Sequence, residues 1–167
     1  MDYSAVRIGE ENILALRALL LEGPAAWTPI HEQVQEDDET AAGYMSLIVG
    51  AFHVAVLRKF SPTYTSSDII QLVAEVRIAL AESGGTLNAL VAESLIREVL
   101  NAPQLKDDGG NDVEDVVLAH VFVLLFLVVE ADYDRAGLEQ FIEDATAQTE
   151  KWLAARRAGA VTQVAEG

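Results

Sequence analysis

Two histidines lie within the most apolar parts of this sequence. His53 follows the run Leu47–Phe52, and His120 precedes the run Val121–Val129. Imidazole binds metal ions and changes its charge near neutral pH, so two such groups brought together would form a metal site or a pH-sensitive pair. The simpler interpretation, which is preferred, is that each histidine is a hydrogen-bonded residue of the core.

Small side chains recur beside the first of these histidines. Gly43, Ser46, Gly50 and His53 follow one another at spacings of three or four residues, which places them on one face of a helix. Small residues allow a second helix to approach closely, and this is the preferred interpretation. The alternative is a groove for a ligand. The candidate ligand-binding residues are therefore Ser46, Gly50, His53 and His120.

One local motif has the spacing of a calcium loop. Asp132 and Asp134 are followed by Gly137 and Glu143, which resembles the carboxylates and the sharp turn of an EF-hand loop. Ala136, however, occupies a ligand position, and no paired second loop is present in the sequence. We expect Asp134 to cap a helix instead. The alternative is a calcium site formed by Asp132, Asp134 and Glu143.

Other signatures of catalysis are missing. His31-Glu32 begins like a zinc-protease helix, but Gln35 stands where the second histidine is required. The chain has no cysteine, which excludes disulfides and thiolate catalysis. No catalytic residue and no cofactor are predicted, and a function other than catalysis is favoured, although carboxylates are too numerous for acid–base chemistry to be excluded.

Helical periodicity and end signals organise the segments that hold these residues. Thr65 and Asp68 have the spacing of a capping box, and Asp112 precedes the most apolar segment. Residues 25–35 are expected to form an irregular bridge with at most a short helical turn. Residues 158–167 are small and polar, which predicts a disordered tail. Helices are expected over about 9–22, 40–60, 66–83, 87–101, 113–131 and 134–157.

These segments predict an all-α fold. About six helices would form a single compact domain over residues 1–157, packed around two apolar central helices near 40–60 and 113–131. The alternative is an α/β fold with a buried strand near 121–129, because valine is common there and periodicity cannot separate a buried strand from a buried helix. The length of segment 113–131 favours a helix.

Composition restricts the classes of partner. The 167 residues carry a net charge of −16, from 27 acidic and 11 basic side chains. Nucleic acids and anionic membranes attract cationic surfaces, so neither partner is expected. A cytoplasmic protein is the expectation. Because 51% of residues are hydrophobic, a non-enzymatic interaction or regulatory module that forms a homodimer is the leading hypothesis. The alternatives are a small-molecule or metal-binding protein, or an acidic inhibitor of a basic protein.

Overall fold

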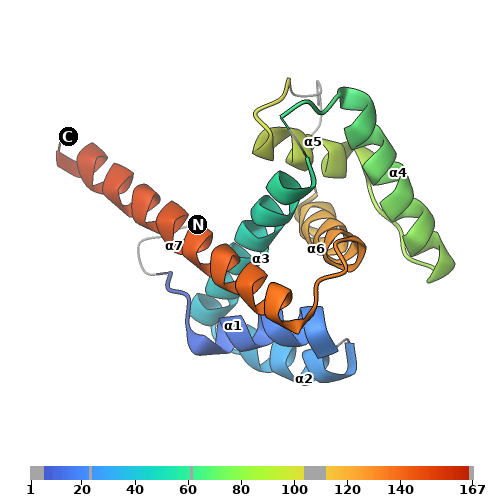
Figure 1. Cartoon of the computed structure of the whole chain (residues 1–167). Helices are drawn as coiled ribbons and strands as arrows, with labels where there is room; N and C mark the ends of the chain where they lie inside the picture. Colours follow the sequence, from blue (N-terminus) through green and yellow to red (C-terminus); the bar gives the residue numbers. More distant parts are fainter. Residues whose placement is uncertain (1–5, 23, 61, 104–111, 166–167) are drawn as a thin grey trace. The chain divides into compact units, whose positions relative to one another are not determined.

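All regular secondary structure in the described part of the computed structural model is helical. Within residues 6–22, 24–60, 62–103 and 112–165, which are the residues that the structure describes, there are seven α-helices and one short π-helical segment, without a β-strand (Figure 1). The predicted all-α fold is confirmed. The alternative with a strand near 121–129 is wrong, because those residues belong to helix α6 (Val113–Glu130).

Contacts along the chain divide it into two compact units. The first unit comprises the chain up to Ala51 together with the part from Asp134 onward, and the second comprises Phe52–Tyr133. Helix α3 (Asp38–Lys59) contributes residues to both units. The predicted single domain over residues 1–157 stays a prediction.

The first unit is built from the N-terminal helices, the first part of α3 and the last helix. Helix α1 (Glu10–Arg17) continues into the π-helical segment Ala18–Glu22, and α2 (Pro24–Gln35) and α7 (Arg135–Ala165) complete the unit. Their apolar faces supply a core that includes Leu16, Val34, Leu47, Ile48, Phe141, Ile142 and Leu153. The bidentate ion pair of Arg17 with Glu139, with nitrogen–oxygen distances of 2.8 and 3.0 Å, joins α1 to α7.

Helix α2 corrects the expected irregular bridge over residues 25–35. The segment is helical from Pro24 to Gln35 even though it contains Pro29. Pro24 stands at the first helical position, where the missing N–H costs nothing. Pro29 removes one intrahelical hydrogen bond, and burial of Val34, which is 2% exposed, favours the helix by packing.

The second unit contains the end of α3, then α4 (Ser66–Glu82), α5 (Ala89–Val99) and α6, with both α4 and α6 in contact with α5 and with each other. The predicted capping box of α4 is confirmed, because Thr65 and Asp68 exchange hydrogen bonds. Asp112 caps α6 as predicted. Helix α5 begins later than expected, since Asn88 is its cap. The core of this unit includes Phe52, Val56, Leu72, Val76, Ile96, Val123 and Leu124.

Helix α7 extends beyond the predicted boundary at residue 157. The structure continues this helix to Ala165, into the segment predicted to be a disordered tail. The extension contains no proline, and Gly159 is the only strong helix-disfavouring residue in it. Near the boundary, Arg157 Nη2 donates a hydrogen bond of 2.6 Å to the carbonyl oxygen of Val6, which attaches α7 to the N-terminal segment.

One helix in the described part of the chain, α3, has the length and composition needed to cross a membrane. More than half of its most apolar stretch is buried inside the protein. The core helix of a globular protein has the same length and composition, and the burial of Leu47, Ile48 and Phe52 is what such a helix shows.

Candidate functional site

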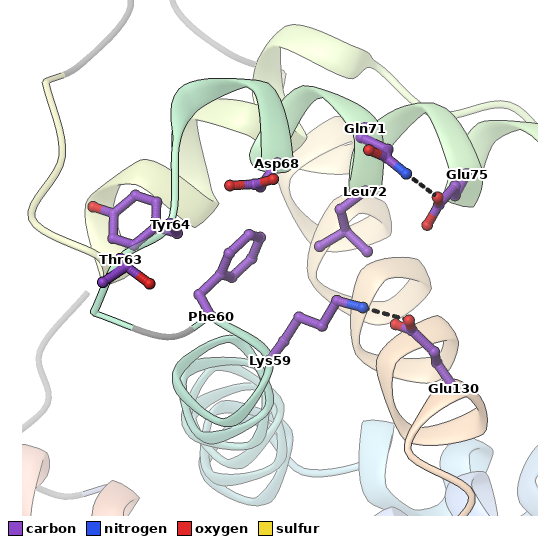
Figure 2. A pocket seen from close by; sticks show the side chains of 9 residues that line it. All are labelled: Lys59, Phe60, Thr63, Tyr64, Asp68, Gln71, Leu72, Glu75 and Glu130. Carbon is purple, nitrogen blue, oxygen red and sulfur yellow. Dashed lines mark hydrogen bonds and ion pairs between the residues drawn. The ribbon is translucent and has the colours of Figure 1, made fainter.

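A groove in the second unit is the larger of the two hollows described here. It has a volume of about 540 Å³ and lies where the ends of α3 and α6 meet the first turns of α4 (Figure 2). Each helix contributes at least one charged side chain to its walls. The lining residues are Lys59, Phe60, Thr63, Tyr64, Asp68, Gln71, Leu72, Glu75 and Glu130.

The middle of the groove is apolar. Phe60 and Leu72 lie there, between the carboxylates of α4 on one side and Lys59 on the other (Figure 2). The rings of Phe60 and Tyr64 meet edge to face, with centroids 5.8 Å apart. The hydroxyl of Tyr64 donates a hydrogen bond of 3.3 Å to the carbonyl oxygen of Leu100, which holds this ring in place.

Three carboxylates and one ammonium group surround this apolar middle. Lys59 forms an ion pair with Glu130 across the gap between α3 and α6. Glu75 accepts a hydrogen bond of 2.9 Å from the amide of Gln71. Asp68 accepts from the backbone N–H of Thr65 at 2.6 Å, and this hydrogen bond lowers the pKa of Asp68 below its usual value. The lining therefore carries two more negative charges than positive ones.

Two helix C-termini add to the negative potential of the groove. Helix α3 ends at Lys59 and α6 ends at Glu130, and both residues line the groove. The last carbonyl groups of a helix carry partial negative charge, which favours cations and disfavours carboxylates. Lys59 is thus well placed at the end of its helix, whereas Glu130 stands at the end where an acidic side chain is unfavourable.

A smaller hollow of about 230 Å³ adjoins this groove between α3 and α6, and shares Lys59 and Glu130 with it. The guanidinium group of Arg58 lies over the ring of Tyr133, 5.6 Å from its centroid. The same arginine donates a hydrogen bond of 3.0 Å to the Tyr133 hydroxyl. Both residues line this hollow.

The chemistry available in the groove is recognition of a cation with an apolar stem. Carboxylates accept charge-assisted hydrogen bonds, and aromatic faces attract cations. None of the nine lining residues is a serine, cysteine or histidine. Among the residues that the structure describes, no group of three or more His, Asp or Glu side chains is placed to hold a metal ion.

The predicted small-residue stripe lies in helix–helix contacts instead of lining either hollow. A Cβ atom on Gly50 would come within 1.9 Å of Thr149 Oγ1 in α7, and one on Gly43 within 2.7 Å of Asn12 Oδ1 in α1. Ser46 is buried, and its hydroxyl donates a hydrogen bond of 2.8 Å to the carbonyl oxygen of Ala42. This arrangement is the close helix packing that the sequence favoured.

The two predicted histidines lie in the second unit. His120 is buried on α6, and its ring meets that of Phe52 edge to face with centroids 4.8 Å apart. His53 is half-buried on α3. Burial lowers the pKa of both imidazoles. Neither lines the groove or the adjoining hollow, so a ligand pocket at Ser46, Gly50, His53 and His120 stays a prediction.

One residue of the calcium-loop motif, Asp134, has a structural role. Asp134 caps α7 by accepting a hydrogen bond of 2.7 Å from the backbone N–H of Gly137. Asp132 follows α6 in the left-handed backbone region, with φ of 47°. Glu143 is exposed on α7. The capping role of Asp134 is confirmed, and the calcium site formed by these carboxylates stays a prediction.

The groove was not predicted from the sequence, although one signal points to it. Its charged residues come from three helices and are separated by up to 71 positions, as in the pair Lys59 and Glu130. No local motif connects them. The signal is Glu130 itself, an acidic side chain at the unfavourable end of a helix whose other acidic residues lie in the first turn.

Comparison with known proteins gives no relative from which to transfer a function. No protein-family model matches the chain, and no significant match appears among curated proteins or among solved structures.

Proposed function

We propose that this chain is a non-enzymatic helical interaction module, and that the groove of α3, α4 and α6 is the surface by which it binds a basic segment of a protein partner. The observation that carries the proposal is the lining of the groove. The groove has a volume of about 540 Å³ and combines an apolar middle with three carboxylates and one ammonium group.

The shape and the charge of the groove favour the same class of ligand. A lysine side chain has an aliphatic stem that packs on apolar surface and an ammonium group that remains at the polar edge. Phe60 and Leu72 offer the apolar surface, and Glu75 and Glu130 offer the carboxylates. An anionic ligand would meet net repulsion.

The charge of the whole chain supports the same proposal. A net charge of −16 attracts basic proteins from a distance and increases the rate of their encounter. Exposed charges interact over about 10 Å at 0.1 M salt, so this attraction weakens as salt rises. The long-range field brings a basic partner close, and the groove selects the side chain that enters.

The test uses a fluorescein-labelled peptide of alternating lysine and glycine, with binding to the full-length protein followed by fluorescence anisotropy. We expect the peptide to bind, and Glu75→Gln and Glu130→Gln each to weaken it by about three- to tenfold, because each removes one charge-assisted contact. Glu82→Gln is the matched control: it removes one charge from α4 without touching the groove and should change the affinity by less than about twofold.

Two results would contradict this proposal. Equal weakening by Glu82→Gln and Glu75→Gln would show that only the net charge matters and that the groove is not the site. The second is that free spermidine binds as tightly as the peptide when each affinity is compared per ammonium group. This result would identify a small amine as the ligand instead of a protein segment.

A second observation favours self-association, the leading hypothesis from composition. Ile70, Ala74 and Ile78 form a stripe along the outer face of α4, where Ile70 is 51% and Ile78 is 66% exposed. Ala74 lies midway between the two isoleucines. A twofold axis at Ala74 would therefore place Ile70 against Ile78 of the partner subunit, with two small alanines at the crossing point. Such an interface is self-complementary, as a homodimer requires.

A further inference from the structure

The ammonium group of Lys59 already occupies one carboxylate of the groove. Its ion pair with Glu130 lies at the surface, with the two side chains 35% and 38% exposed. Solvent-exposed ion pairs of this kind contribute little to stability, because solvent screens the attraction and two long side chains lose conformational freedom. An incoming cation therefore meets a contact that is easily exchanged.

The position of Glu130 indicates a role beyond this pair. An acidic side chain at the C-terminus of α6 faces the negative end of the helix. Lys59 reduces this repulsion in the unliganded protein. A ligand cation beside Glu130 and Glu75 would reduce this repulsion in the same way.

The other carboxylates of the groove differ in their freedom to bind. Asp68 is occupied by the backbone and hydroxyl of Thr65, at 2.6 and 2.8 Å. Glu75 accepts a hydrogen bond from Gln71, a neutral donor that leaves the negative charge of the carboxylate uncompensated. Glu75 is thus open to a ligand cation, and Glu130 becomes open when Lys59 leaves it. Phe60 and Leu72 lie beside these two carboxylates in the groove (Figure 2).

We propose that the groove recognises a primary alkylammonium group, the head of a lysine side chain, which replaces the ammonium of Lys59 at Glu130. In this exchange the aliphatic stem lies along Phe60 and Leu72, and Lys59 moves outward into solvent. Lys59 acts as an internal competitor that lowers the affinity of the groove. This inference rests on the proposed function, since it concerns how the same groove selects its ligand.

The experiment measures binding of the lysine–glycine peptide to the variant Lys59→Met. This substitution keeps an unbranched side chain and removes the competing charge. We expect binding about three- to fivefold tighter than to the wild-type protein, which corresponds to loss of a surface ion pair. Lys151→Met is the matched control, because it makes the same charge change on the exposed surface of α7. It should tighten binding by less than about twofold.

A peptide in which every lysine is acetylated tests the chemistry of the head group and should not bind. Thermal unfolding of each variant confirms that it is folded, and Lys59→Gln provides a second removal of the charge if Lys59→Met is unstable. If Lys59→Met and Lys151→Met have the same effect, or if the acetylated peptide binds as well, the exchange is wrong. If the wild-type protein and Lys59→Met both fail to bind the lysine peptide, the proposed function fails with it.

Discussion

His120 lies on the buried side of α6, where Nδ1 is 2.8 Å from the carbonyl oxygen of Val116. A carbonyl oxygen only accepts, so Nδ1 carries the proton of the neutral ring. Burial lowers the pKa of this imidazole below its ordinary value of 6.5, against smaller opposing effects of this hydrogen bond and of Glu98. At the scale of single residues, His120 is therefore a core residue that resists protonation.

The consequence is a loss of stability in mild acid. Well above pH 6.5 the ring is neutral in both folded and unfolded protein, and it contributes no pH dependence. As the pH falls below that value, the unfolded chain binds a proton that the folded protein does not bind. The free energy of unfolding therefore falls as pH decreases. One proton gives a slope of at most about 1.4 kcal/mol per pH unit.

Urea unfolding between about pH 5 and 6.5 measures this slope. His120→Gln should reduce it, because the variant has nothing to titrate at this position. His53→Gln is the comparison, since half-burial also lowers the pKa of His53, and it should reduce the slope less. The lowered pKa values of Asp37, Asp68 and Glu139 lie below this window. An unchanged slope in His120→Gln would show that the folded protein accepts the proton.

At the scale of elements, the approach of α3 to α7 depends on the absence of one side chain. Thr149 is buried, and its hydroxyl donates a hydrogen bond of 2.7 Å to the carbonyl oxygen of Ala145. This fixes Oγ1 against Gly50, where a Cβ would also lie 3.2 Å from that same carbonyl oxygen. The helices must separate if Gly50 acquires a side chain.

We therefore expect Gly50→Ala to lower the free energy of unfolding by about 1–3 kcal/mol through overpacking, measured by urea titration. Removing the threonine in the double variant Gly50→Ala/Thr149→Ala should recover part of that loss. Such coupling is what a double-mutant cycle detects for residues in contact. Additive effects of the two substitutions would contradict the proposed contact.

The same scale shows what sequence patterns predict well. The start of α4 was predicted because Thr65 and Asp68 lie three positions apart, so the capping-box signal is local in sequence. Helix α2 was missed because Pro29 is a local signal against a helix, whereas the burial of Val34 depends on tertiary packing. The groove was missed for a related reason, because Lys59 and Glu130 become neighbours only after two helices have packed.

At the scale of the whole molecule, charge and apolar surface act in opposite directions. Two copies that each carry −16 repel one another, and salt reduces this repulsion. Pairing through the stripe Ile70, Ala74 and Ile78 should therefore strengthen as salt rises, because burial of apolar surface is not weakened by screening. Binding of a basic segment in the groove should weaken over the same range. The salt dependence separates the two modes of interaction.

Sedimentation equilibrium at about 50 and 500 mM salt tests the first of these modes. We expect the dimer fraction of the wild-type protein to increase with salt, and Ile78→Glu to remain monomeric, because it places two carboxylates inside the interface. Val113→Glu is the matched control, since Val113 is 77% exposed on another helix and the variant adds the same charge. If both variants dimerise to the same extent, or if the dimer weakens with salt, α4 is not the self-association surface.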